Sequence, residues 1–211
     1  MLRRDNRPYP VRTANWAARA DAGVASILVR ATSLLPMGST LSWIAVRGRT
    51  SQAVLEGFGL TDSGVEYNEF DHTLALAGAP LRGGWYVVID HDVEEDFVFD
   101  YAPEFMAEIS LGGEAIYCYN SYQGPVSASA GWSSGREVWA LHHVGDDADD
   151  ADNLAIRGEL PPSFTDIRAG AVGSEEVGEG ITIFDVPLEV ARALTGFRRD
   201  GDDIPRLTRL D

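Results

Sequence analysis

Two stretches of the chain, 41–47 and 85–90, are rich in Trp, Val and Ile and have the length and pattern of β-strands. Between them, residues 49–58 predict a short helix that begins after a Thr50 or Ser51 cap and ends at the glycines of 57–59. An acidic loop separates this helix from a strand at 73–79. The turn at 79–84 then predicts that the strands at 73–79 and 85–90 form a hairpin.

Residues 101–111 have a Pro near their start, apolar residues at 105, 106, 109 and 111, and a Gly-Gly pair directly afterwards. This pattern predicts an amphipathic helix, and residues 115–119 predict the strand that follows it. The predicted order over 41–119 is strand, helix, strand, strand, helix, strand. That order is similar to the split βαβ pattern of ferredoxin-like folds, a resemblance of element order alone.

The C-terminal part predicts a further hairpin, 126–130 and 137–141, around a turn at 132–136, and an edge strand at 154–157. A helix at 161–172, a short strand at 181–184 and a last helix capped by Asp185 come next, and the end from Arg198 to Asp211 is expected to fray. The fold class is therefore α+β. A mainly antiparallel sheet is covered by helices, ferredoxin-like in its first half and extended by a C-terminal hairpin and two helices.

Charge divides the chain at Met37. Residues 1–36 contain six of the 17 basic residues and two of the 33 acidic residues. Residues 37–211 therefore contain 11 basic and 31 acidic residues and carry a formal charge of −20. We predict a single acidic domain over 37–211 and a basic N-terminal extension over 1–36. The extension is expected to be disordered or the product of a start codon upstream of Met37, with a docked helix over 14–35 as the alternative.

All the basic residues are Arg, so lysine chemistry such as Schiff-base formation is excluded. The single cysteine, Cys118, excludes internal disulfides and multi-cysteine metal sites and is typical of a reducing compartment, which makes a cytoplasmic location the simplest expectation. No apolar run is long enough to span a membrane. The negative charge disfavours binding to nucleic acid and anionic membranes and favours a basic protein partner. The Lys-free composition is typical of a bacterial or phage gene.

Acidic side chains are densest in two segments, 90–96 and 146–152. The first contains His91, so a metal-dependent hydrolase with Asp90, His91 and Asp92 as ligands is one hypothesis, although no known ligand spacing is met. The second lacks the Gly and Glu that an EF-hand loop requires. Solvated acidic loops explain both segments without a ligand, and no cofactor is predicted.

Residues 131–135 match the G-x-S-x-G pattern of hydrolases with Ser133 in the nucleophile position, but the strand that follows favours an ordinary hairpin turn. His142 and His143 are neighbours on a strand, so their rings are expected on opposite faces, with the inward one partly buried. His72 is expected in a loop. Cys118 is interpreted as a small core residue.

Aromatic residues near this acidic surface suit a protein-binding face, with plain core packing as the alternative. The sequence therefore predicts a non-enzymatic acidic protein-binding domain, similar in physical type to bacterial immunity or inhibitor proteins, with homo-oligomerisation left open. A metal-dependent hydrolase and a structural or phage-assembly component are the alternatives. The candidate partner-binding residues are Asp90, Asp92, Glu94, Glu95, Asp96, Tyr117, Tyr119, Trp132, Asp147 and Asp149.

Overall fold

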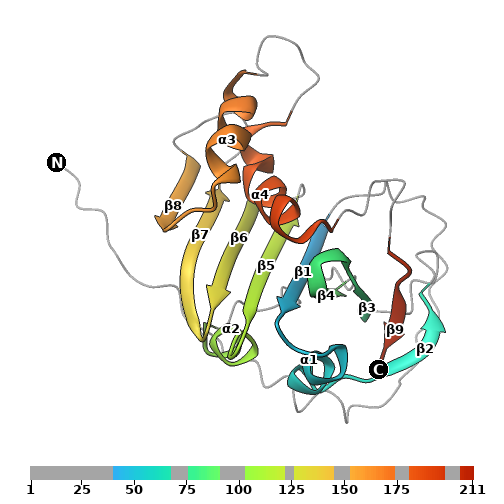
Figure 1. The fold of residues 1–211 in the computed structure, drawn as a ribbon. Helices are drawn as coiled ribbons and strands as arrows, with labels where there is room; N and C mark the ends of the chain where they lie inside the picture. Colours follow the sequence, from blue (N-terminus) through green and yellow to red (C-terminus); the bar gives the residue numbers. More distant parts are fainter. Residues whose placement is uncertain are drawn as a thin grey trace, which may run out of the picture. The chain divides into compact units, whose positions relative to one another are not determined.

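The computed structural model describes residues 40–67, 76–90, 103–121, 126–144, 153–173, 181–197 and 205–211. These residues form nine strands, four α-helices and two short 3-10 helices (Figure 1). In chain order the elements are β1 (Thr40–Arg47), α1 (Ser51–Phe58), β2 (Asp62–Glu66), β3 (Leu76–Pro80), η2 (Arg82–Gly84), β4 (Trp85–Asp90), α2 (Pro103–Ile109), β5 (Glu114–Ser121), β6 (Val126–Ser133), β7 (Arg136–Val144), β8 (Leu154–Gly158), α3 (Ser163–Gly173), η5 (Ile183–Asp185), α4 (Val186–Thr195) and β9 (Thr208–Leu210).

All nine strands belong to one sheet with the order β2-β9-β3-β4-β1-β5-β6-β7-β8. Each neighbouring pair of strands in this order is antiparallel. The predicted α+β class and mainly antiparallel sheet are therefore confirmed. Within this order β1 lies between β4 and β5, which means that the first strand joins the β3–β4 hairpin to the run of strands from β5 to β8.

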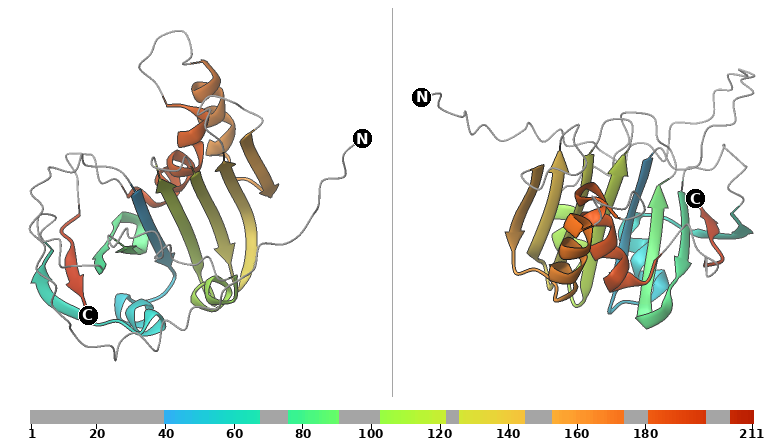
Figure 2. Two further views of the ribbon diagram at one scale, coloured as in Figure 1. Left: turned by 180° about the vertical axis from the view of Figure 1, so that it is seen from behind. Right: turned by 90° about the horizontal axis from the view of Figure 1, so that it is seen from above.

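Helices lie on both faces of the sheet, as Figure 2 shows. Trp43 and Ala45 of β1 face a core that contains residues of α3 and α4, including Phe164, Val190 and Ala191. The alternate β1 residues face a second core, which contains residues of α1 and α2. Because successive side chains of a strand point to opposite faces, β1 has to be apolar at nearly every position rather than at every second one.

The ends of two helices depend on specific residues. The Thr50 hydroxyl accepts a hydrogen bond of 3.2 Å from the Ala53 amide, and Gly59 ends α1 with φ of 69°. The predicted cap and glycine stop of α1 are therefore confirmed. Asp185 does precede α4, but its carboxylate accepts hydrogen bonds from the Thr182 amide and hydroxyl, both 2.9 Å, and makes no side-chain cap to α4.

Three elements differ from the sequence prediction. The acidic loop after α1 contains the strand β2, and the end that was expected to fray contains β9, which pairs with both β2 and β3. Residues 181–184 do not form a strand, because 183–185 belong to the 3-10 helix η5. β2 and β9 are short and polar, so their strand structure depends on pairing partners distant in sequence and has no local signal.

The β6 residues that face α3 and α4 are all small: Ser127, Ser129 and Gly131. Trp139 of β7, directly opposite Gly131, lies over this glycine, and a Cβ atom at position 131 would overlap the indole ring. The small face of β6 therefore makes room both for the Trp139 ring and for α4.

We predict that Gly131→Ala lowers the free energy of unfolding by about 1–3 kcal/mol, because the rigid indole has to move to admit a methyl group. Chemical denaturation measures this change. Gly170→Ala in α3 is the matched control, since no atom lies within 4 Å of the added Cβ, and it should raise the free energy of unfolding by about 0.4–1 kcal/mol. Equal effects of the two substitutions would contradict this packing.

Tyr86 of β4 lies beside Gly78 of β3, where an added Cβ would come within 2.8 Å of the Tyr86 hydroxyl and 3.0 Å of Leu210 Cδ1. The missing side chain of Gly78 thus lets the Tyr86 ring reach the C-terminal strand β9. Burial, and secondarily the Asp62 carboxylate, raises the pKa of Tyr86 from 10.0 to about 12.

The folded protein should retain the Tyr86 proton in the range between pH 10 and pH 12, where the unfolded chain loses it. The contribution of Tyr86 to the free energy of unfolding therefore falls as the pH rises through this range. A difference titration of tyrosinate absorbance between the wild type and Tyr86→Phe measures this single group. A midpoint near pH 12 is expected, and a midpoint near pH 10 would show that the phenol is not buried.

Candidate functional site

At one end of the sheet, β3, β1 and β6 begin and β4, β5 and β7 end, so their terminal residues lie in a common row. Across the face that carries α1 and α2, Leu76, Asp90, Ser42 and Tyr119 lie opposite one another on β3, β4, β1 and β5. Ala128 and His142 continue this row on β6 and β7. We call this part of the molecule the strand-end edge.

Three acidic segments attach to the strand-end edge. Residues 68–75 lead into β3, residues 91–102 leave β4, and residues 145–152 connect β7 to β8. They hold two, five and five acidic residues respectively and no Arg. The predicted site residues Asp92, Glu94, Glu95, Asp96, Asp147 and Asp149, and the histidines His72 and His91, lie in these segments and so outside the described residues.

Of the predicted acidic residues in the segment 90–96, only Asp90 belongs to the described residues. Its side chain is only 4% exposed and lies on the α1/α2 face opposite Ser42, which is also 4% exposed. A carboxylate in this position has little surface to offer a partner in the folded protein. Asp90 is therefore a buried residue at the end of β4, directly before the segment 91–102, and not a surface residue.

The opposite face of the strand-end edge carries a row of buried polar residues. Asn120, Ser127 and His143 lie opposite one another on β5, β6 and β7, and each is at most 2% exposed. Ser129 follows on β6 at 1% exposed. We call these four residues the polar row. Within the described part of the chain, Asn120 Nδ2 and the hydroxyls of Ser127 and Ser129 have no hydrogen-bond partner.

The two histidines face opposite sides of β7, as predicted. His143 is fully buried and its ring makes an edge contact with Phe184 of η5, with ring centroids 5.5 Å apart. His142 is on the other face and exposed to solvent. Desolvation by the surrounding protein lowers the pKa of His142, and the neighbouring His143 lowers it further, because both disfavour the charged form of His142. The two rings therefore cannot act on one ligand together.

Among the described residues, the polar row shows no hydrogen-bonded pair of nucleophile and base. Ser127 lies opposite His143, but its hydroxyl makes no hydrogen bond to any described residue, whereas a nucleophile and its base need to be hydrogen-bonded. Both side chains are also fully buried, and the His143 ring packs against Phe184 of η5. The alternation of Ser and Ala at 126–130 placed Ser127 and Ser129 on one face, but only the structure shows that this face is covered.

The predicted aromatic anchors are mostly inside the molecule. Tyr117 is 5% exposed and Trp132 is 7% exposed, and both belong to the α1/α2 core. Tyr119 is partly buried against the same core at the strand-end edge. The geometry favours core packing for Tyr117 and Trp132, and of the three only Tyr119 has a partly open ring close to the acidic segments.

The G-x-S-x-G match is a tight hairpin turn. Ser133 of β6 pairs with Arg136 of β7, and the two residues between them, Ser134 and Gly135, have positive φ angles of 50° and 81°. Two successive positive φ values are typical of a type I′ turn. The turn interpretation is confirmed, because a nucleophile elbow has a helix after the serine and here a strand follows.

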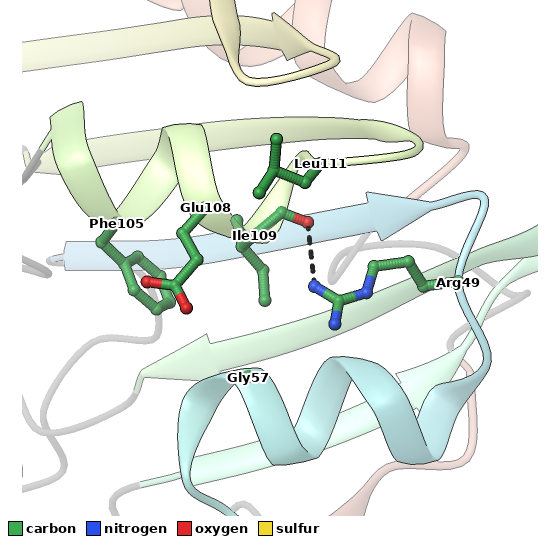
Figure 3. Close-up of a pocket in the computed structure, with 6 residues that line it drawn as sticks. All are labelled: Arg49, Gly57, Phe105, Glu108, Ile109 and Leu111. Atoms are coloured by element: carbon green, nitrogen blue, oxygen red, sulfur yellow. Dashed lines mark hydrogen bonds between the residues drawn. The ribbon is translucent and has the colours of Figure 1, made fainter.

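A shallow hollow lies between α1 and α2, and none of the predicted site residues lines it (Figure 3). Its volume is about 240 Å³, and Arg49 at its rim donates a 3.4 Å hydrogen bond to the Ile109 carbonyl. The lining residues are Arg49, Gly57, Phe105, Glu108, Ile109 and Leu111.

Among the described residues, no group of three His, Cys, Asp or Glu side chains is arranged to hold a metal ion.

Cys118 is a core residue, as predicted. It is fully buried, and burial raises the pKa of its thiol, so the reactive thiolate is suppressed in the folded protein. We predict that a thiol reagent at pH 8 leaves the native protein unlabelled and modifies it only after denaturation. Ser51→Cys, at the exposed start of α1, is the positive control. Rapid labelling of the native wild type would contradict the burial.

Within the described ranges, no helix is both long and apolar enough to cross a membrane. No protein-family model, curated protein or solved structure matches the chain. No likeness to a known protein therefore assigns a role to any of these residues.

Proposed function

We propose that this protein is a non-enzymatic acidic binding domain, of the immunity or inhibitor type, whose partner is a basic protein. The partner binds at the strand-end edge through the acidic segments that attach there, with Asp92, Glu94, Glu95, Asp96, Asp147 and Asp149 supplying the charge. The single observation that carries this proposal is the uneven distribution of charge between the described elements and the segments of sequence that connect them.

The connecting segments hold most of the excess charge. Of the 31 acidic residues in 37–211, 18 lie outside the described residues, together with two Arg, whereas the described residues hold 13 acidic residues and nine Arg. Twelve of those 18 belong to the three segments at the strand-end edge. A high density of one sign of charge raises the association rate of an oppositely charged protein.

Arginines of the folded elements pair with carboxylates of the same chain. In the described residues, ion pairs link Arg47 to Glu114, Arg157 to Glu137, Arg192 to Glu189, Arg206 to Glu66, and Arg209 to Asp211. Most of these pairs are exposed, so each contributes little to stability. Their consequence is electrostatic: the folded elements neutralise much of their own charge and leave the connecting segments as the source of the negative field.

The finer fold assignment also belongs to this proposal. Strands β3, β4, β1 and β5 are adjacent and antiparallel, so β1 and β3 run parallel with β4 between them, and β4 and β5 run parallel with β1 between them. Residues of α1 and α2 share one core on one face. Two interleaved split βαβ units of this kind support a ferredoxin-like first half. In this arrangement the segment between β4 and α2 starts at the strand-end edge.

Neutralising Asp92, Glu94, Glu95 and Asp96 as Asn or Gln should weaken partner binding and flatten its salt dependence, because fewer attractive charge pairs remain to be screened. Wild-type full-length bait, this variant and a control variant are compared in pull-downs from lysate of the source cells, washed at low and at high salt. The control neutralises four exposed carboxylates elsewhere: Glu104, Glu108, Glu159 and Asp166.

The expected result is one basic protein that is retained at low salt by the wild type and the control, released at high salt, and lost from the variant. The affinity of the recovered protein for the wild type, the variant and the control, measured at several salt concentrations, then gives the salt dependence of each interaction. If every recovered protein binds the variant and the wild type equally, or binds the control as weakly as the variant, the acidic segment is not the binding surface.

A further inference from the structure

The two outer strands of the sheet are protected very differently. β2 contains Asp62 and Glu66, has Gly64 at φ of 70°, and its register with β9 shifts between Asp62 and Glu66. Charges and irregular backbone are the usual means by which an edge strand avoids pairing with another chain. β2 is therefore unsuited to accept a further strand.

β8 carries fewer of these protections: its one charged residue is Arg157, and its one residue with positive φ is Gly158 at the end of the strand, with φ of 78°. All five residues of β8 pair in continuous register with β7, the strand contains no acidic residue, and 155–158 are exposed. Ile156 is 43% exposed, one of the few large apolar residues so exposed in the described part of the chain. Among the described residues, no strand pairs with the outer edge of β8 (Figure 1). A regular, partly apolar edge of this kind is a template for another strand.

The sequence of β8 is complementary to itself. In an antiparallel pair between two copies, a two-fold axis at Ile156 places Ile156 opposite Ile156 of the second copy. It also places Ala155 opposite Arg157, and Leu154 opposite Gly158. No like charges then lie directly opposite one another, and all five residues take part. A two-fold axis at Arg157 would instead oppose two guanidinium groups and use fewer residues, which disfavours it.

The positive charge of Arg157 is neutralised by an ion pair within the same chain. Its guanidinium makes two hydrogen bonds to the Glu137 carboxylate of β7, of 2.7 and 2.9 Å, on the α1/α2 face. Arg157 therefore approaches Ala155 of a second copy as half of an ion pair and not as an isolated cation. The strand can thus approach its own copy even though the whole chain carries a formal charge of −16.

We propose that the protein forms a two-fold symmetric dimer in which β8 pairs with β8 of a second copy, joining the two sheets edge to edge with Ile156 at the axis. This interface uses the outer edge of β8, whereas the surface proposed for a basic partner uses the acidic segments at the strand-end edge, one of which, 145–152, leads into β8. Because both copies are negatively charged, added salt screens their repulsion, so the dimer tightens with salt. A basic partner shows the opposite dependence.

Sedimentation of the full-length chain at low and high salt measures the dimer. The wild type should dimerise more strongly at high salt. Ile156→Lys should weaken the dimer about tenfold or more, because it removes the apolar pair and places two ammonium groups at the axis. Val65→Lys is the matched control, since Val65 is 57% exposed on the other edge strand, and it should leave the dimer unchanged. Unchanged thermal unfolding confirms that each variant folds.

Cross-linking tests the axis independently of affinity. Directly opposite residues of an antiparallel pair have Cβ atoms about 4.5–5.5 Å apart, close enough for a disulfide after small adjustments. Cys118 is buried, so an added cysteine is the one accessible thiol among the described residues. Mild oxidation with diamide should convert Ile156→Cys to a covalent dimer much faster than Val65→Cys.

Two outcomes would overturn the proposal. A wild type that is monomeric at every salt concentration would show that β8 does not pair. A dimer that survives Ile156→Lys, with equal cross-linking of the two cysteine variants, would place the interface elsewhere. Neither outcome bears on the basic partner, whose binding is measured with other variants and has the opposite salt dependence.

Discussion

The pairing of β1 with both β4 and β5 is the constraint on which the rest of the molecule depends. β1 joins two sets of strands that are otherwise separate, and its residues alternate between two cores. Trp43 is fully buried and contacts Phe197 after α4, with ring centroids 5.3 Å apart, while Ile44 faces α1 and α2. The strand thereby fixes the position of helices on both faces.

The same register places the strand-end edge. Because β1 holds β4 and β5 at fixed positions, Asp90, Ser42 and Tyr119 lie in one row, and the acidic segment after Asp90 begins at the same end as the segment after β7. Segments whose first residues, 91 and 145, are 54 residues apart in the sequence thus attach to one end of one sheet. The fold brings the attachment points of these acidic segments to one end of the sheet, while five of the nine arginines in the described residues form ion pairs within the chain.

The sequence predicted elements with a local physical signal. The apolar run of β1, the Thr50 cap, the opposite orientations of His142 and His143, and the tight turn at Ser134 and Gly135 each depend on neighbouring residues, and each agrees with the structure. β9 could not be predicted, because three polar and apolar residues form a strand only when β2 and β3 lie on either side. The burial of Tyr117 and the polar row depended on which helix covers which face, and a strand pattern does not contain that information.

The central claim is that a basic partner binds the strand-end edge. Amide hydrogen exchange of the full-length chain, with and without the recovered partner, tests it most directly. The account predicts slower exchange in peptides that cover 91–102, 145–152 and the adjoining ends of β4 and β7, and no change around the hollow between α1 and α2. Protection confined to that hollow or to β2 and β9 would contradict it.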